Sequence, residues 1–450
     1  MIDFNELAGT CISQIESGSN LPFAWFDLGK CYMLQGKAHD AFPAISNAID
    51  QAVAPDDLAR MTNELGNIQE QVKNPPIYDL ALKLLKIGLA GKFRDKKAIR
   101  ALANQATQSG RTLDGAVLIL AGASDESADS KVGLYRDLMI GAFKDFFGTI
   151  ISGGTKQGVG KLAGDIQEKY PKIAFSIGYI PEKLPDNIER DHRYSEIRTT
   201  PGSRFNIMQP VQYWIDIIAA GIDPKTVSII GIGGNGLSYF EYTLGVALGA
   251  KVAVLESSMD SVRNQSGHLL WKSLKRVVSL PEDPYIIRAF VGTGLPPFPD
   301  EIRDVMARAL HEAYRYSDSD LKSVQSMKEW DELSPELKHS NYCAVDSVIQ
   351  KLNELGYRIN VISGGDIKDT RLSNEEVEIL SEMEHARWMA ERLLKGWVYG
   401  TTKDFEKKTD PSLVLWGDLS DSMKDIDRIA VRKLPTYLKN FDFELRKTRS

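Results

Sequence analysis

The sequence is poor in the residues that hold metal ions and disulfides. Its 450 residues include three cysteines, Cys11, Cys31 and Cys343, and six histidines. The cysteines form no CxxC pair and are odd in number, and no HExxH motif occurs, so the sequence predicts neither a disulfide framework nor a metal site. No firm cofactor follows from the composition.

The sequence also lacks long apolar runs and a strong excess of one charge. No run of about 18 apolar residues occurs, and the first residues lack the basic and apolar regions of a signal peptide, so we expect a cytoplasmic protein without a membrane span. The formal charge of -6 gives no strong indication of nucleic-acid binding, although it leaves a local basic groove open. The length and a hydrophobic content of 43% predict a globular protein of about two to four domains.

Residues 1–110 are rich in helical patterns, and residues 22–55 fit the tetratricopeptide pattern of about 34 residues. The matching positions are Trp25, Leu28, Gly29, Tyr32, Ala41, Ile45, Ala48 and Pro55. The small residues Gly29 and Ala41 are expected where two helices approach closely, and the following helices should cover the apolar face of the single repeat. The alternative is an ordinary amphipathic hairpin. We expect this region to bind a partner protein or to mediate self-association.

Short apolar segments alternate with helical patterns beyond residue 110. Such segments are typical of buried parallel strands covered by helices on both faces. Ligands of these sheets gather at the carboxyl ends of the strands, where the glycine loops of this chain fall. We therefore expect an α/β domain over residues 111–295. The expected strands lie at residues 115–122, near 150, and at 173–179, 227–232 and 251–255. A helix is expected at about 129–146, between the first two strands.

The densest local signal lies at residues 226–258. Gly231, Gly233 and Gly236 satisfy the GxGxxG spacing after a β-branched run, and Glu256 follows the last glycine by about 20 residues. Taken alone, this pattern predicts a redox dinucleotide site with Glu256 on a ribose.

A second glycine loop at residues 153–159 changes this interpretation. It follows another buried strand, and backbone N–H groups at such a loop can hold a phosphate. It is not a Walker A loop, because Leu162 stands where Ser or Thr must follow Gly160 and Lys161. Two loops in one sheet favour phosphate binding without hydride chemistry, and Glu256 becomes the end of a strand. The alternative is that both loops are tight turns without a ligand.

The two loops resemble the LSDAT branch of the SLOG superfamily, which includes the N-terminal region of melastatin-type TRP channels and bacterial relatives. The matching segments are residues 150–155, Gly158 to Asp165, residues 176–181, and Gly233 to Gly236 with Glu241. The resemblance implies a Rossmann-like domain that binds a nucleotide ligand such as ADP-ribose or a cyclic relative. The expected ligand-binding residues are Gly122, Ser124, Gly153, Gly154, Thr155, Gly158, Gly233, Gly234, Asn235 and Gly236.

Two alternatives to a sensor stay open. The cytokinin-activating enzymes of the same superfamily cleave N-glycosidic bonds and carry PGGxGT before a glutamate, which suggests Glu241 as the catalytic residue of a nucleotide or NAD hydrolase. This chain departs from the motif at Ile232 and Leu237, and Glu241 lies one residue late. The other alternative is an interaction scaffold whose sheet binds nothing.

A charged connection joins the two glycine loops over residues 191–204. We expect it to act as a lid in which Arg193, Arg198 or Arg204 meets phosphate with a planar guanidinium. The alternative is a solvated loop with charge pairs.

A proline-rich linker at residues 294–300 follows a short expected strand at 289–291 and separates the sheet from a helical connector at 296–372. Helices are expected at 300–316, 321–338 and 343–355, with a strand at 358–363. Trp330, Leu333, Leu337, Ser340 and Asn341 are expected to dock this connector on the last module.

The last module, residues 373–450, carries aromatic and basic residues at helical spacing. His385, Trp388 and Arg392 share one helix face, and Gly396 should end the helix before Trp397 and Tyr399. Chemistry alone favours a small aromatic core with a polar network. The stretch resembles the RyR domain, a helical module repeated in ryanodine receptors and present in bacterial signalling and defence proteins. The resemblance implies that these five residues bind a nucleotide-type ligand.

The sequence thus predicts a Rossmann-like parallel sheet of the SLOG type, flanked by an all-α tetratricopeptide-like N-terminal region and a mostly helical RyR module. The predicted function is that of a nucleotide sensor or adaptor, binding an ADP-ribose-like or cyclic nucleotide signal in anti-phage or stress signalling.

Overall fold

A computed structural model of the chain describes most of its residues. The described residues are 3–71, 75–107, 112–113, 115–122, 132–234, 236–260, 276–292, 298–315, 327–361 and 371–447. The chain forms two compact units. Unit 1 comprises residues 1–143 and 147–282, and unit 2 comprises residues 144–146 and 283–450. No helix among the described residues has the length and apolarity that a bilayer span requires.

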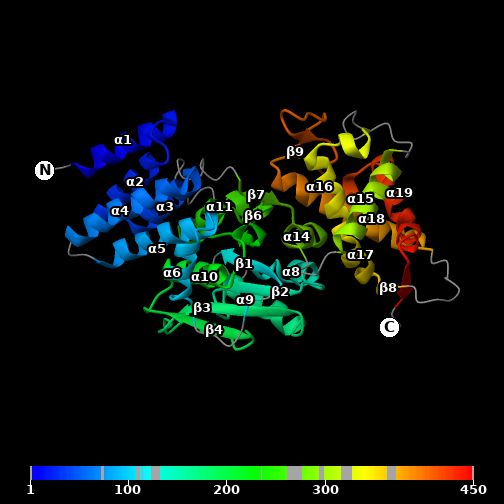
Figure 1. Cartoon of the computed structure of the whole chain (residues 1–450). Helices are drawn as coiled ribbons and strands as arrows, with labels where there is room; N and C mark the ends of the chain where they lie inside the picture. Colours follow the sequence, from blue (N-terminus) through cyan, green and yellow to red (C-terminus); the bar gives the residue numbers. More distant parts are fainter. Residues whose placement is uncertain are drawn as a thin grey trace. The chain divides into compact units, whose positions relative to one another are not determined.

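The N-terminal region of unit 1 is entirely helical, as predicted. Its helices are α1 (Phe4–Ser17), α2 (Phe23–Leu34), α3 (Ala38–Gln51), α4 (Pro55–Gln71), α5 (Pro75–Lys92) and α6 (Lys96–Ala103) (Figure 1). Helices α2 and α3 pack against each other, and the expected close approach is present at Gly29 and Ala41. A Cβ at Gly29 would lie 2.9 Å from Cγ1 of Ile45 and 3.2 Å from the carbonyl oxygen of Ala41.

The rest of unit 1 is built on a parallel sheet of seven strands in the order β4-β3-β2-β1-β5-β6-β7. All neighbouring strands are parallel. The sheet therefore has the Rossmann-like form that the sequence predicts. The strands are β1 (Ala116–Gly122), β2 (Gly148–Ser152), β3 (Ala174–Pro181), β4 (Glu196–Thr200), β5 (Ser228–Ile232), β6 (Lys251–Leu255) and β7 (Val278–Leu280).

The strand order reverses between β1 and β5. The chain runs outward from β1 to β4, returns to β5 beside β1, and then runs outward the other way to β7. Gly122, the last residue of β1, lies opposite Ile232, the last residue of β5. Parallel α/β sheets bind ligands at such a switch point, outside the carboxyl ends of the strands. The loop after β5 and the loop after β2 therefore flank the expected ligand crevice.

The N-terminal helices share one apolar core with the helices on one face of the sheet, α10 (Met208–Ala219) and α11 (Gly236–Leu248). Helices α9 (Gly158–Lys169) and α11 belong to crossovers that run in opposite directions, so right-handed connections place them on opposite faces. Helix α11 packs on α3 and α5, and α10 packs on α5 and α6. A Cβ at Gly91 of α5 would lie 2.9 Å from Cδ2 of Leu248, so these helices are in close contact.

Unit 2 is mostly helical and has its own core. The antiparallel strands β8 (Tyr357–Val361) and β11 (Phe443–Lys447) tie its connector to its C-terminal end. The helices are α14 (Pro284–Val291), α15 (Asp300–Arg315), α16 (Pro335–Asp346), α17 (Val348–Glu354), α18 (Asn374–Leu394) and α19 (Asp421–Lys439). Short turns η3 (Trp330–Glu332) and η4 (Trp416–Asp418) and strands β9 (Val398–Tyr399) and β10 (Thr409–Asp410) complete the unit.

Several predicted elements were wrong. Residues 289–291 lie inside helix α14, which Asp283 caps by accepting from the backbone N–H groups of Tyr285 and Ile286. The helix expected at 321–338 begins only at Pro335, after the turn η3, where Ser334 caps it. Residues 321–326 of that prediction lie outside the described residues.

Two further differences concern the α/β region. The helix expected from residue 129 to 146 is described only as α8 (Arg136–Ala142). Part of the charged connection expected as a lid forms the edge strand β4 instead, in parallel pairing with β3. The sequence does not reveal this strand, because its buried residues Arg198 and Thr200 are themselves polar.

The close approach at Gly29 makes a matched pair of glycine variants informative. We predict that Gly29→Ala lowers the stability of unit 1 by about 1–3 kcal/mol, because the added methyl overlaps Ile45. Gly66→Ala should raise the stability of unit 1 by up to about 1 kcal/mol, because Gly66 lies inside α4 and alanine favours helix. A Cβ at Gly66 would meet no other described side chain within 4 Å. Thermal unfolding followed by circular dichroism would measure both, and equal shifts would contradict the close approach.

Candidate functional site

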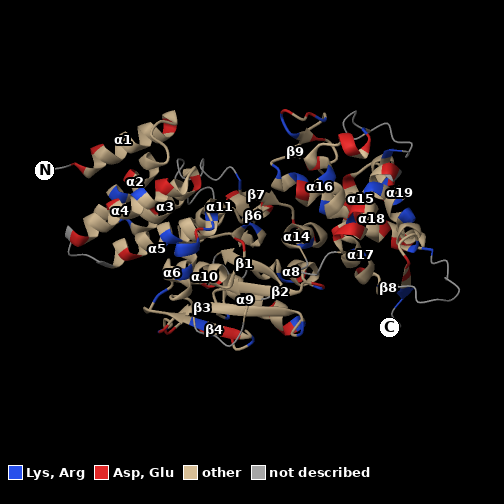
Figure 2. Cartoon of the chain, in the orientation of Figure 1, with Lys and Arg blue, Asp and Glu red and all other residues tan. Residues whose placement is uncertain are grey.

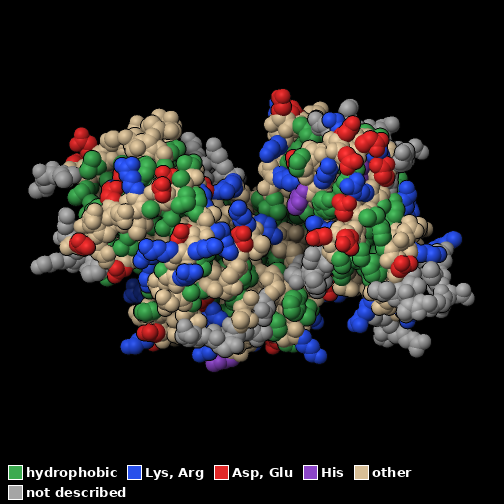
Figure 3. All heavy atoms as spheres, in the orientation of Figure 1, with side chains coloured by type: hydrophobic (Ala, Val, Ile, Leu, Met, Phe, Trp, Pro, Cys, Tyr) green, Lys and Arg blue, Asp and Glu red, His purple; other side chains and the backbone are tan. Residues whose placement is uncertain are grey.

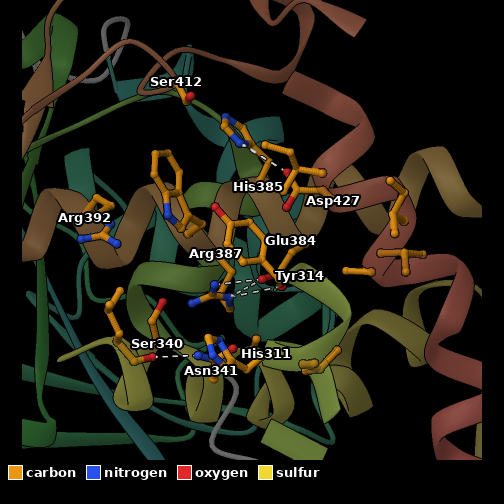
Figure 4. Close-up of a pocket in the computed structure, with 18 of the residues that line it drawn as sticks. His311, Tyr314, Ser340, Asn341, Glu384, His385, Arg387, Arg392, Ser412 and Asp427 are labelled. Carbon is orange, nitrogen blue, oxygen red and sulfur yellow. Dashed lines mark hydrogen bonds and ion pairs between the residues drawn. The ribbon is translucent and has the colours of Figure 1, made fainter. Parts of the chain in front are cut away.

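Unit 2 contains a cavity of about 250 Å³. One wall is apolar and comes from α19 and the connector helices α15 to α17, while the facing wall comes from α18 (Figure 4). The segment 403–412 contributes further residues to the lining. The apolar wall is formed by Leu310, Leu333, Leu337, Ala344, Val348, Leu419, Met423, Ile426, Ile429, Ala430, Val431 and Leu434.

Helix α18 places His385, Trp388 and Arg392 on the cavity, in the spacing that the sequence predicts. The helix begins with a capping box, in which Ser373 and Glu376 each bond the backbone of the other. Gly396, with φ of 78°, follows its end in the left-handed region and turns the chain away. The local sequence therefore fixes both ends of the helix that carries the polar wall.

A buried ion-pair network lies between these residues. The Arg387 guanidinium donates to Glu384 at 2.8 Å and to Glu391 at 2.7 Å, and Lys351 of α17 forms a short ion pair with Glu384. Burial alone would raise the pKa of Glu384, but the two cations overcome this effect and lower the pKa to about 2. Ser340 donates to Glu391 at 2.7 Å, which ties the connector to α18 as expected. The network fixes the polar wall of the cavity.

His385 and Asp427 face one another at one end of the cavity (Figure 4). Nε2 of His385 lies 2.8 Å from the carbonyl oxygen of Val414 and donates to it, which leaves Nδ1 without a proton at 3.7 Å from Asp427. Burial lowers the pKa of His385. Burial and then the Glu384 carboxylate raise the pKa of Asp427 to about 8, although 19% of this side chain is exposed. Both groups are therefore largely uncharged at neutral pH.

Arg392 is the unusual member of the wall. Its guanidinium lies 4.9 Å from the Trp397 ring and 5.8 Å from the Trp388 ring, and the residue is only 7% exposed. Within the described part of the chain, Nε has no hydrogen-bonding partner, and the nearest carboxylate, Glu336, is 3.6 Å from a terminal nitrogen. A buried guanidinium with so few acceptors is costly unless something else pairs with it.

The two remaining residues predicted for this site lie elsewhere. Trp397 is buried beneath Arg392 and packs edge-on against Phe405, which itself lines the cavity. Tyr399 is 58% exposed and is not part of the lining. Trp397 thus supports Arg392 from behind, and a ligand contact by Tyr399 stays a prediction.

Sequence reasoning missed most of the charged residues around the cavity. Glu384, Arg387 and Glu391 stand at helical spacing, so their pairing on α18 could have been inferred. Lys351 and Asp427 come from other helices. No local pattern predicts that Lys351 contacts Glu384 or that Asp427 faces His385. Among the described residues, no cluster of His, Cys, Asp or Glu suits a metal ion.

In unit 1, most glycines of the two loops are required by the fold itself. Gly154 has φ of 65°, and a Cβ there would lie 2.9 Å from the Cα of Gly178. A Cβ at Gly122 would lie 2.3 Å from the carbonyl oxygen of Ile232, and one at Gly234 would lie 2.7 Å from Cβ of Ser238. Gly158 and Gly233 also have positive φ. These glycines would be needed with or without a ligand.

Two glycines have room that the fold does not use. Among the described residues, the nearest neighbour of a Cβ at Gly153 is Phe205 at 4.0 Å, and that of a Cβ at Gly236 is His39 at 3.8 Å. Thr155 is buried, with Oγ1 3.5 Å from the carbonyl oxygen of Gln157. The predicted residues Ser124 and Asn235 lie outside the described residues.

Arg193 and Arg198 of the charged connection are engaged in ion pairs, while Arg204 is exposed. Arg193 donates to Asp191 at 2.7 Å and also pairs with Asp165. Arg198 points from β4 into the core, where it pairs with Asp216 at 2.8 Å and with Glu196 at 2.7 Å. These are the charge pairs of the alternative interpretation, and a phosphate contact by Arg193, Arg198 or Arg204 stays a prediction.

Glu241 lies on α11, where its Oε1 accepts a hydrogen bond of 3.2 Å from the Tyr213 hydroxyl of α10. Burial raises the pKa of Glu241 to about 8, and the Tyr213 hydrogen bond opposes this only in part. A protonated carboxyl could act as a general acid at neutral pH. Its role in hydrolysis stays a prediction.

The raised pKa of Asp427 predicts a pH effect on the stability of unit 2. The folded state keeps a proton that the unfolded state releases, so the free energy of unfolding should fall as the pH rises from about 4 to about 8. The asparagine side chain of Asp427→Asn cannot ionise, so this variant should unfold at a higher temperature than the native chain at pH 8. The difference should be about 2–4 °C for each kcal/mol in the free energy of unfolding, and it should be small near pH 4.5.

The control for this prediction is Asp418→Asn, which alters an exposed aspartate of the same unit. It should change the unfolding temperature equally at both pH values. If Asp427→Asn behaved in the same way, the carboxyl of Asp427 would be ionised normally in the folded state.

Comparison with known proteins identifies one part of this architecture. A search of curated proteins found no match to the chain. Residues 366–447, which carry α18, α19 and the strands β9 to β11, match the family described as the RyR domain. The match includes the polar wall of the cavity and the apolar surface of α19, but not the connector helices that complete the lining. The match supports the resemblance of the C-terminal part of the chain to the RyR domain.

Proposed function

We propose that the protein is a sensor or adaptor for a nucleotide-type signal, and that the cavity of unit 2 binds the phosphate-bearing part of this ligand. The observation that carries the proposal is Arg392, a buried residue whose Nε has no hydrogen-bonding partner among the described residues and whose ion pair with Glu336 is 3.6 Å long. Phosphate matches the planar donor set of an arginine and would supply the missing acceptors.

The charges around the cavity support an anionic ligand. Within the described residues, the cations Lys351, Arg387, Arg392 and Lys395 face the carboxylates of Glu336, Glu384 and Glu391. Because the pKa of Asp427 is about 8, its carboxyl adds little negative charge at neutral pH. The surroundings of the cavity therefore keep an excess of positive charge.

The aromatic and apolar lining supports a planar group beside the phosphate. Trp388 is half-buried on the cavity and lies nearly parallel to His385, with ring centres 5.7 Å apart. A volume of about 250 Å³ is small for a ligand site, where about 300 Å³ is a common lower bound. We infer that the cavity takes a mononucleotide-sized group, such as one half of an ADP-ribose or of a cyclic dinucleotide.

A second ligand site of the proposal is the crevice at the switch point of the sheet. Gly153 and Gly236 leave space that packing does not fill among the described residues. Both stand at the carboxyl ends of strands, where the backbone of a loop can approach a phosphate. An LSDAT-type ligand such as ADP-ribose would use this space.

Arg392→Gln tests the cavity. Titration calorimetry first shows which of ADP-ribose, cyclic ADP-ribose and a cyclic dinucleotide binds the whole chain. We expect the variant to weaken the binding of that ligand by about 10-fold or more, since a charged hydrogen bond contributes about 1.5–3 kcal/mol. Weak binding of uncharged adenosine should be unchanged. The unfolding temperature should not fall, because the buried charge lacks a good partner.

Arg432→Gln is the matched control, since Arg432 is exposed on α19 outside the cavity. It should leave binding unchanged. A lower unfolding temperature for Arg392→Gln with unchanged affinity would assign Arg392 to the fold and reject the cavity as the phosphate site.

Gly153→Ala and Gly236→Ala test the crevice. Each new methyl fits the fold, so both variants should unfold at the native temperature. Each would occupy the space that a phosphate needs, so ADP-ribose binding to the whole chain should weaken by about 10-fold. Unchanged affinity in both would argue for loops without a ligand. The hydrolase alternative predicts that the native chain releases free base from NAD and that Glu241→Gln does not. That result would favour a hydrolase over a sensor.

A further inference from the structure

A concentration of cations lies on unit 1, at residues outside the proposed crevice at the switch point of its sheet. It covers α5, α6 and the turn before β5. Figure 2 shows blue segments on the ribbons of α5 and α6, and Figure 3 shows blue side chains gathered in the same place. This basic face is formed by Lys83, Lys86, Arg94, Lys96, Lys97, Arg100 and Lys225. It stands out in a chain whose formal charge is -6.

The fold holds these residues on one continuous surface. Helix α6 buries Ala98 and Leu102, which leaves Lys96, Lys97 and Arg100 exposed on its other side. The turn between α5 and α6 is fixed to the turn before β5, because Arg94 donates to the carbonyl oxygen of Ile222 at 3.3 Å. Gly91 packs close to Pro224 in the same place, which brings Arg94 and Lys225 together.

The cations of the basic face are not neutralised by the protein. In the part of the chain that the structure describes, none of them forms an ion pair, whereas cations elsewhere in unit 1, such as Arg193, do. The two carboxylates that interrupt the run are engaged with backbone. Asp95 accepts from the N–H of Ala98 at 2.7 Å, and Asp223 accepts from the N–H of Lys225 at 3.0 Å.

We propose that the basic face binds the phosphate backbone of a nucleic acid. Regularly spaced phosphates require only cations, and affinity follows from counterion release. A membrane-binding helix would carry exposed Trp, Phe or Leu beside the cations, and a protein interface would have an apolar or aromatic centre. No large hydrophobic residue is exposed between Val53 and Leu134 among the described residues. The face therefore fits a polyphosphate backbone better than either.

The binding would be independent of base sequence, because contacts of lysines and arginines with phosphates carry no sequence information. Affinity should fall steeply with salt, with a slope of about 0.9 for each phosphate contact on duplex DNA. Nucleic-acid binding would be independent of the proposed nucleotide ligand.

The experiment measures fluorescence anisotropy of a labelled duplex of about 25 base pairs with the whole chain at several salt concentrations. Charge reversal of Lys96→Glu, Lys97→Glu and Arg100→Glu together should weaken binding by about 10-fold or more and reduce the salt slope by about 2–3. Because these side chains are exposed, the unfolding temperature should stay unchanged, and binding of ADP-ribose should be unaffected.

The matched control reverses three exposed cations of α19, through Arg432→Glu, Lys433→Glu and Lys439→Glu. This variant has the same net charge and should bind the duplex as the native chain does. Equal loss in both triple variants, absence of binding at low salt, or binding to vesicles of anionic lipid but not to DNA would overturn the proposal.

Discussion

The cavity of unit 2 depends on the burial of charge along helix α18. Glu384 can stay ionised in the interior only because Arg387 and Lys351 reach it from two helices. Buried charges are stable when paired and costly when not. Asp427 is largely buried beside Glu384 and has no ion pair with Lys or Arg among the described residues, so its pKa is raised and it keeps its proton. The ion pairs of Glu384 thus affect the protonation of both Glu384 and Asp427.

Unit 1 depends on a different constraint, the equal direction of all strands in its sheet. Segments far apart in the sequence, at residues 122, 153 and 233, follow strands that end at the same edge. The chain needs no specific long-range contact between these loops to bring them together. The direction of the strands does not by itself fix the conformations of the loops. Backbone packing requires glycine at some loop positions and not at others.

The sequence predicted well those features that depend on a local pattern. Five strands, the N-terminal helices, the cavity-facing spacing on α18 and the stop at Gly396 all follow from periodicity or glycine conformation. It failed where polar residues sit in regular structure. The charge of Arg198 favours a loop where strand β4 lies, yet Asp216 of α10, far away in the sequence, makes the burial of Arg198 possible. Likewise, nothing near Asp427 indicates that it faces His385. Pairings between distant segments carry no local signature, so the sequence alone could not give them.

The shared core of the N-terminal helices and the sheet has a consequence for the way in which this chain could have been assembled. Tetratricopeptide-like segments usually behave as separable modules, but here α3 and α5 cover α11 directly, and Gly91 admits Leu248 into close contact. Exchange of the helical segment for another would uncover the apolar side of α11, because a new segment would not match its shape. Recombination near residue 110 should therefore be rare among functional descendants, and the helices and the sheet should be inherited as one piece.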